Sequence, residues 1–303
     1  MSFLAHAARL GAVVALTGCA VFPPLPTPRL SGDWATHHLS DPEIRESSGL
    51  ALSSAQPPRL WTHNDSGDRA RLFLCDLDGA LVAEYAVDGA KAVDWEDIAS
   101  DGAGHIYIGD IGNNSSARRD LTVYRIAEPD PREPARRVRV ERALHFRYAD
   151  QTAFPDPARN FDGEALYVAG GALWILTKHR GDTGTTLYRL ADAPGDAEQV
   201  LEPVQRIALP IDSAPFGTVT AADASLDGRL VAVLLYQAIL VYERNPDGTL
   251  AARPRAHIAL DMRRTGQVEG IAWVGGGLFF DNEPGDLFRI PNPLDPSLER
   301  YPP

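Results

Sequence analysis

Residues 95–108 read WEDIASDGAGHIYI, and this stretch decides the fold. A short apolar segment begins on the polar residue Glu96, and a second apolar segment, Ile106–Ile108, follows after Asp101-Gly102. Asp-Gly supplies the positive φ that a two-residue hairpin turn requires. The stretch therefore predicts two antiparallel strands that are joined by a tight turn.

The same pattern recurs along the rest of the chain, and a third apolar strand follows each pair. The first strands begin at equivalent positions, namely Ser48, Glu96, Glu164, Thr220 and Glu269. A fourth strand follows in most of the repeats, at Leu81–Val87, Val138–Tyr148, Val204–Leu209 and Ala256–Leu260. Four-stranded units that repeat every 40 to 60 residues or so are typical of β-propeller blades.

The two ends of the repeated region determine the expected number of blades. The last repeat has three strands, and Gly32–Ser40 precedes the first repeat without a repeat of its own. We therefore expect residues 32–303 to form one all-β domain, a five-bladed β-propeller whose ring is closed by an N-terminal strand. A six-bladed ring is the alternative, and a β-sandwich with accidental periodicity is a third interpretation.

The N-terminal residues indicate export. Leu10–Leu16 is apolar but too short to span a bilayer as a mature helix, which is typical of a signal peptide over residues 1–18. The sequence Leu16-Thr17-Gly18-Cys19 then resembles the lipobox of bacterial lipoproteins, in which the Cys is acylated, with palmitate for example, and becomes the new N-terminus. An ordinary signal peptide with a chance Cys is the alternative.

The residues after the signal peptide suggest where the protein is anchored. Residues 19–31 are predicted to hold the lipidated Cys19 and a Pro-rich tether, Val21–Arg29. Two or more acyl chains anchor a protein stably. Because Ala20 rather than Asp follows Cys19, the start is similar to that of lipoproteins sorted to the outer membrane. We expect a lipid-anchored protein of the bacterial cell envelope, at the outer membrane and facing the periplasm, with the inner membrane as the alternative.

The composition excludes several classes of protein. The chain has 29 Lys and Arg against 41 Asp and Glu, a formal charge of −12, so no nucleic-acid partner is expected. Two Cys are too few for a disulfide-rich scaffold or a four-Cys zinc site, and Cys75 is predicted to be a small buried thiol. We expect a monomer whose partners are the membrane, through its lipid, and a small ligand or envelope protein.

Candidate site residues gather where the first strands start and the second strands end, because these positions meet at one face of a propeller pore. The starts supply the carboxylates of Glu96, Glu164 and Glu269 and two hydroxyls. The second-strand ends supply Asn64, Asp65, Asp110, Asn113, Lys178, His179, Gln237, Asp281, Asn282 and Glu283. Oxygen ligands without a His or Cys set favour Ca²⁺, held by the three glutamates. A water-filled pore, in which Lys178 offsets part of the charge, is the alternative.

The catalytic candidates are less well defined than the carboxylates. Asp110, His179 and Lys178 lie near the expected pore face, and His179 with Glu164 or His63 with Asp65 could form an acid–base pair. No nucleophile elbow of the G-x-S-x-G type occurs in the sequence. We therefore treat Ser48, Asn64, Asp65, Asn113, Thr220, Asn282 and Glu283 as residues that line a ligand-binding pore.

The inner-strand motifs resemble those of the SdiA-regulated family of bacterial envelope β-propellers. They are Ser47–Leu50, Trp95–Ala99, Asp162–Leu166, Val219–Asp223, Val268–Ala272 and Asn282-Glu283-Pro284. The chain resembles more distantly the calcium-dependent propellers of the phytase-like esterase, lactonase and paraoxonase type. The resemblance implies a propeller with Ca²⁺ in its pore, but it supplies no activity. The His dyad of the paraoxonases has no clear match here.

Two classes of function follow from these patterns. The first is a lipid-anchored envelope propeller that binds a small ligand or a protein partner at its pore face, with a structural Ca²⁺. The second is a Ca²⁺-dependent hydrolase of esters, lactones or phosphoesters. In that enzyme the three glutamates would hold Ca²⁺, which would polarise the substrate oxygen, and Asp110 or His179 would handle protons.

Overall fold

A computed structural model describes residues 35–133, 135–195, 197–210, 217–295 and 298. The predicted signal peptide, Cys19 and the tether lie outside the described residues. The described chain is all-β apart from one short helix, α1 (Met262–Thr265), which confirms the all-β part of the prediction. In this part of the chain, no helix has both the length and the apolar character that crossing a bilayer requires.

Three of the four sheets contain four antiparallel strands each. The first runs β10 (Asp162–Ala169), β11 (Ala172–Lys178), β12 (Gly184–Leu190) and β14 (Pro203–Ala208). The second runs β15 (Val219–Ala224), β16 (Leu230–Leu235), β17 (Ala238–Glu243) and β18 (Ala256–Ala259). The third runs β19 (Val268–Val274), β20 (Gly277–Asn282), β21 (Asp286–Ile290) and β1 (Ala35–His38), so the first described strand pairs with the last described strand.

The fourth sheet joins two repeats. It holds β2 (Ser47–Leu52), β3 (Arg59–Asn64), β4 (Arg71–Asp76) and β5 (Leu81–Asp88), then β9 (Arg137–Tyr148), β8 (Thr122–Ala127), β7 (His105–Asp110) and β6 (Trp95–Ser100). The long outer strand β9 makes the junction: its start pairs in parallel with β5, its middle pairs with β8, and its end pairs with β13 (Gln199–Leu201). The sequence repeat did not predict this pairing, because a repeat assigns β9 to one blade only.

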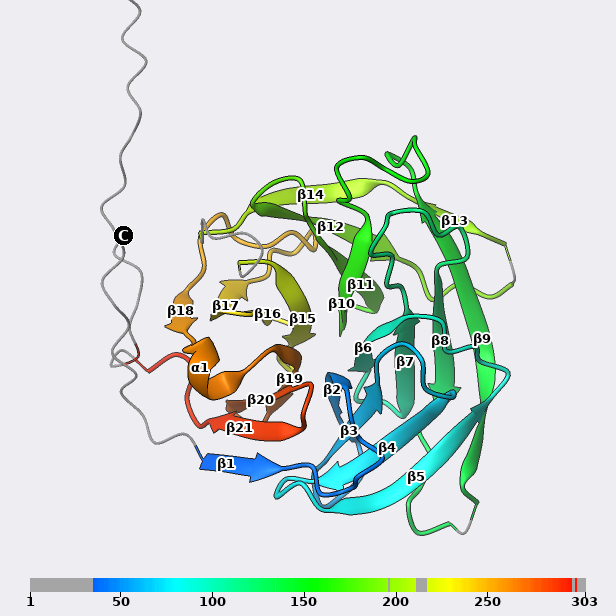
Figure 1. Ribbon diagram of the computed structural model, residues 1–303, viewed down its shortest axis with the longest axis vertical. Coiled ribbons are helices and arrows are strands. Elements are labelled where there is room, and N and C mark those ends of the chain that lie inside the picture. Colours follow the sequence, from blue (N-terminus) through cyan, green and yellow to red (C-terminus); the bar gives the residue numbers. More distant parts are fainter. Residues whose placement is uncertain (1–34, 134, 196, 211–216, 296–297, 299–303) are drawn as a thin grey trace, which may run out of the picture.

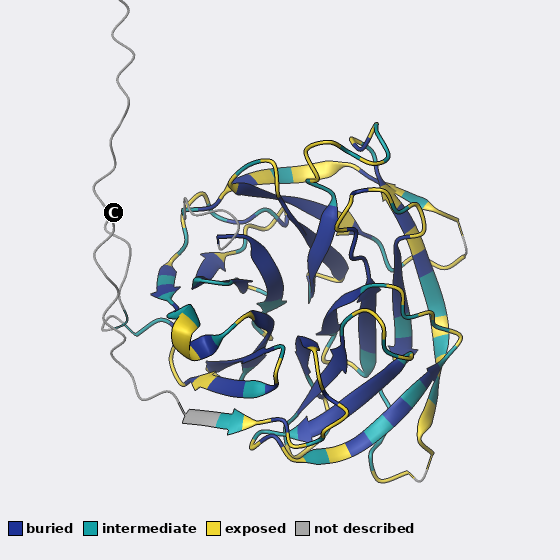
Figure 2. Ribbon diagram, viewed as in Figure 1, coloured by how far each residue is buried: buried dark blue, intermediate teal, exposed yellow. Residues whose placement is uncertain are grey.

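The sheets are arranged around a common centre (Figure 1). Strands β2, β6, β10, β15 and β19 are innermost, and each contacts the next until β19 contacts β2. The inner strands are buried along nearly their whole length, whereas β5 and β9 alternate between buried and exposed residues (Figure 2). This difference is expected if both faces of each inner strand are covered and one face of each outer strand meets water.

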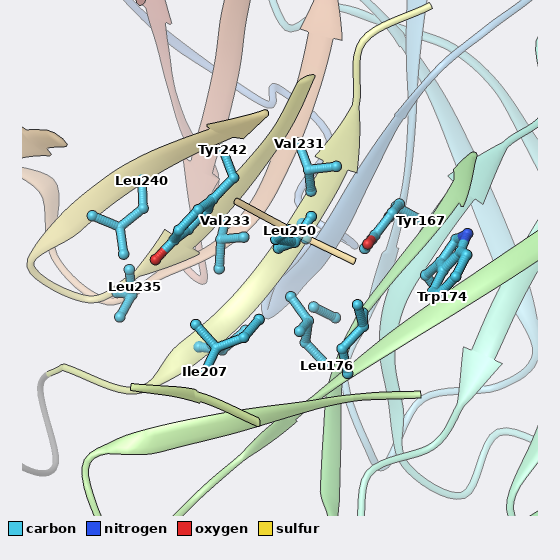
Figure 3. Packing of buried hydrophobic residues seen from close by; sticks show 14 of the residues in the cluster. Tyr167, Trp174, Leu176, Ile207, Val231, Val233, Leu235, Leu240, Tyr242 and Leu250 are labelled. Carbon is cyan, nitrogen blue, oxygen red and sulfur yellow. The ribbon is translucent and has the colours of Figure 1, made fainter. Parts of the chain in front are cut away.

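Apolar side chains fill the space between neighbouring sheets. Between the β10–β14 sheet and the β15–β18 sheet, Tyr167, Trp174 and Leu176 pack against Val231 and Val233 (Figure 3). Apolar burial is the main favourable term in folding, so these interfaces hold the ring together. The single thiol of the described chain, Cys75, is buried in β4 as predicted.

Buried aspartates connect the inner strands to one another. The Asp97 carboxylate in β6 accepts hydrogen bonds from the backbone N–H groups of Ile98 at 2.8 Å, Leu166 at 2.8 Å and Ala222 at 3.3 Å. Asp223 in β15 similarly accepts from the N–H of Trp273 in β19 at 2.8 Å. These carboxylates satisfy N–H groups that no strand partner reaches, and they tie three or more sheets together at the centre.

Candidate functional site

The five predicted first-strand positions share one backbone feature. In the pairing of each first strand with its second strand, one residue of the first strand has no partner opposite it. This residue is Glu96, Glu164, Thr220 or Glu269, and in the first repeat Ser48 and Gly49 are both left out of the pairing. Each of these residues therefore stands in a β-bulge at the start of an inner strand. A bulge redirects a side chain and is common next to binding sites. The five positions that the sequence indicated as equivalent therefore share the same local backbone irregularity.

Further polar residues lie two positions before three of the bulges. They are Asp94, Asp162 and Gln267, and side chains two residues apart on an extended chain lie on the same face. They were not among the predicted site residues, although each lies two residues before a predicted glutamate, and this spacing identifies all three. Arg180 and Tyr236 complete the site from loops, where no periodic pattern could have indicated them.

One half of the site is built around the ammonium group of Lys178. Its Nζ lies 2.6 Å from Glu164 Oε2 and 3.3 Å from the Tyr236 hydroxyl, which donates to Glu269 Oε1 at 3.1 Å. Gln267 also donates to Glu269 at 2.9 Å and contacts Glu283. Burial alone would lower the pKa of Lys178, but Glu164 and the other pore acids raise it well above its usual value. Lys178 therefore stays charged.

The other half of the site contains two overlapping groups of carboxylates. Oxygen atoms of Asp65, Asp94 and Glu96 lie within 4.8 Å of one another, and so do those of Glu96, Asp162 and Glu164. Glu96 belongs to both groups and is only 7% exposed. Within the described chain, no donor forms a hydrogen bond with the Glu96 carboxylate. No described Lys or Arg forms an ion pair with the first group, which consists of Asp65, Asp94 and Glu96.

Crowding and burial perturb these carboxyl groups strongly. Burial, followed by the charges of Asp65 and Asp162, raises the pKa of Asp94 to about 6. Burial raises the pKa of Glu96 well above its usual value, and Glu164 raises it further. Burial also raises the pKa of Glu269 to about 7, against the opposing effect of Lys178. Each of these shifts means that the charged form of the carboxyl group is disfavoured in the pore unless a cation lies beside it.

Asp162 and Glu164 differ from the first group because cations already compensate them. Asp162 accepts from Arg180 at 2.8 Å and from the N–H of Asn113 at 2.6 Å. Arg180 also lies 3.9 Å from Glu164, which Lys178 contacts from the other side. The uncompensated negative charge is thus concentrated on Asp65, Asp94 and Glu96.

A glycine allows the first group to assemble. A Cβ atom at Gly112 would overlap the carboxyl groups of both Glu96 and Asp94. Behind it, Asp110 accepts from the N–H of Asp94 at 3.0 Å and from Arg118 at 2.9 Å. The catalytic candidate Asp110 therefore lies behind the site, where it orients the backbone of Asp94.

The predicted histidines also have partners away from the carboxylates. His179 Nδ1 bonds Asp182 at 2.8 Å and its Nε2 bonds the Thr186 hydroxyl at 3.1 Å, so its partners do not include Glu164. His63 is fully buried, its Nδ1 bonds the carbonyl of Asn64 at 3.0 Å, and burial lowers its pKa to about 4. Both rings serve local structure in this arrangement.

Most of the predicted pore-lining amides and hydroxyls have local partners. Asn64 accepts from the N–H of Arg45, Asn113 from those of Ala117 and Arg118, and Asn282 from that of Asp286, so each organises the loop after its strand. The Ser48 hydroxyl donates to the Glu96 carbonyl at 2.7 Å. Thr220 is buried, and its hydroxyl has no hydrogen-bond partner within the described residues. Ser48 and Thr220 therefore extend the ring without adding charge.

Comparisons with known proteins identify no family. No family model matches the chain, and no curated protein matches it. The resemblance to the SdiA-regulated family therefore stays a prediction.

Two solved structures show a distant likeness. The PQQ-bound aldose sugar dehydrogenase of Streptomyces coelicolor is 12% identical, with a TM-score of 0.48, over 87% of this chain and 99% of that one. A protein of unknown function from Bacteroides thetaiotaomicron is 11% identical, with a TM-score of 0.46, over 84% of this chain and 71% of that one.

Proposed function

We propose that the protein is a five-bladed β-propeller that binds one Ca²⁺ at Asp65, Asp94 and Glu96 and uses this ion to bind a ligand at its pore face. The pairing of β1 with β21 supports a ring closed by the N-terminal strand. The closed circle of contacts among β2, β6, β10, β15 and β19 supports five blades.

The spacing of the carboxylates is compatible with Ca²⁺. Oxygens that bind one Ca²⁺ at 2.3–2.6 Å lie at most about 5 Å apart, and one oxygen from each of the three carboxylates lies within 4.8 Å of the other two. Like charges about 4 Å apart repel by roughly 4 kcal/mol at an effective dielectric of about 20, and a divalent cation removes that repulsion. The observation that carries the proposal is Glu96, a buried carboxylate that has neither a hydrogen bond nor an ion pair with any described residue.

A binding function agrees better with the site than hydrolysis does. Three carboxylates leave coordination positions open, since Ca²⁺ takes six to eight oxygen ligands, and oxygen atoms of a ligand can fill them. A hydrolase would need a proton-transferring group beside the ion. Asp110 instead bonds Arg118 and the Asp94 backbone, and His179 bonds Asp182 and Thr186.

Calcium titration of the purified protein tests the proposed site. We expect one ion per chain, and we expect Glu96→Gln to weaken binding by at least about 100-fold, because losing even an outer-shell partner of a metal costs 10- to 100-fold. Glu243→Gln is the matched control, since Glu243 is an exposed carboxylate that pairs with Arg255 away from the pore. Equal affinities of Glu96→Gln and the wild type would reject the site.

We further propose that Cys19 carries the lipid anchor and that the propeller faces the periplasm from the outer membrane. Cells grown with radioactive palmitate should label the wild-type protein and should leave Cys19→Ser unlabelled. Replacement of Cys75 by Ser should not affect labelling, because this thiol is buried in β4. Label that persists in Cys19→Ser, or that is missing from the wild type, would refute the anchor.

A further inference from the structure

Lys178 stands among the three glutamates that the sequence indicated as metal ligands. Its ammonium contacts Glu164 directly at 2.6 Å and reaches Glu269 through the Tyr236 hydroxyl. Glu96 is the third carboxylate whose charge acts on it. The side chain is only 5% exposed, so this ammonium is a buried cation inside an acidic ring.

We propose that Lys178 is a tethered cation that fills one of two adjoining cation positions in the pore, so that the pore accepts a single divalent ion, at Asp65, Asp94 and Glu96. The inference rests on the proposed Ca²⁺ site for the second position. Lys178 would then determine both how many ions bind and where the ion sits.

The hydrogen bonds of the pore divide it into these two positions. From Glu164 a continuous chain runs through Lys178, Tyr236, Glu269 and Gln267, and each of these groups has a partner. No such chain reaches Asp65 or Asp94 from the described cationic side chains. One position therefore contains a cationic side chain, whereas no cationic side chain among the described residues pairs with the other.

Glu96 provides independent evidence that the two positions adjoin. It is more than nine-tenths buried, its carboxylate has no hydrogen-bond donor among the described residues, and its oxygens lie within 4.8 Å of both acidic groups. A carboxylate that is shared in this way can bind an ion on the Asp65 side, while the Lys178 ammonium contacts Glu164 on the other side. A divalent ion and an ammonium that competed for Glu164 would repel each other, which keeps the ion on the Asp65 side.

Removing the ammonium should open the second position. Lys178→Met keeps an unbranched apolar stem of similar length but deletes the charge, which leaves Glu96, Glu164 and Glu269 without their common cation. Calorimetric titration with Ca²⁺ alone should then give two ions per chain, against one for the wild type. Tyr236→Phe is the matched control, because it removes a hydroxyl that contacts Lys178 but retains the ammonium, and it should still bind one ion.

The outcomes separate this inference from the proposed function. If Lys178→Met and the wild type each bind one Ca²⁺ per chain, the inference is overturned. If the wild type binds no ion and Lys178→Met binds one, the result rejects the proposed Ca²⁺ site but supports Lys178 as a tethered cation. If Lys178→Met does not fold in Ca²⁺-free buffer, this variant and Lys178→Gln are refolded at increasing Ca²⁺ concentrations, and their Tm values are compared with those of the wild type. A rise in Tm of either variant with Ca²⁺ that exceeds the wild-type rise supports the inference, and an equal or smaller rise overturns it.

Discussion

Replacing Asp97 by Ala should lower the free energy of unfolding by about 3 kcal/mol or more. The Asp97 carboxylate accepts three backbone hydrogen bonds, from Ile98, Leu166 and Ala222, and it is completely buried. Each N–H group that is left buried without a partner costs about 1–3 kcal/mol. The three donors lie in strands of three different repeats, so the loss weakens the centre of the ring rather than one hairpin.

Urea denaturation in the presence of Ca²⁺ measures this effect. Asp97→Asn should be intermediate, since the amide retains one acceptor oxygen but turns an N–H₂ group toward the remaining donors. Asp247→Ala serves as the control, because Asp247 accepts its hydrogen bonds from Thr249 in an exposed turn. An Asp97→Ala protein within about 1 kcal/mol of the wild type would show that the central carboxylate does not hold the inner strands together.

In Ca²⁺-free buffer, stability should fall as the pH rises from about 5 to 8. The pKa of Glu269 rises from its usual 4.5 to about 7 in the folded protein, mainly because the group is buried. Between these values the folded state binds more protons than the unfolded state, so raising the pH favours unfolding. At 1.36 kcal/mol for each pKa unit, Glu269 alone would contribute roughly 3 kcal/mol.

Two measurements assign this slope to the pore. Glu269→Gln should reduce the loss of Tm between pH 5 and pH 8, because the amide does not ionise. Added Ca²⁺ should raise the Tm more at pH 8 than at pH 5, since the ion binds the ionised carboxylates of the folded protein only. A Tm that increases with pH over this range in Ca²⁺-free buffer would contradict the proposed electrostatics of the site.

The repeated strands and the bulged ring positions could be predicted from the sequence because they obey local rules. A polar residue at the start of a short apolar segment indicated where Glu96, Glu164 and Glu269 enter the ring. The parallel pairing of β5 with β9 could not be predicted, because it depends on how far the outer strand of one repeat reaches into the next.

The composition of the site was predicted less completely than its place in the fold. The three glutamates were selected as metal ligands, but the structure places Lys178 between Glu164 and Glu269, and it brings Asp65 and Asp94 to Glu96. A contact between Lys178 in one repeat and Tyr236 in the next is a tertiary contact that no spacing reveals. Asn64, Asn113 and Asn282 lie at the expected strand ends, but their side chains are engaged in loop hydrogen bonds.

A crystal structure of the wild-type protein in saturating Ca²⁺, with anomalous scattering recorded for calcium, would locate the ion proposed at Asp65, Asp94 and Glu96. We expect one anomalous peak, bounded by the oxygens of Asp65, Asp94 and Glu96 at about 2.3–2.6 Å, while the Lys178 ammonium still contacts Glu164. A peak between Glu164 and Glu269, with Lys178 displaced, or a pore without any peak, would contradict the account.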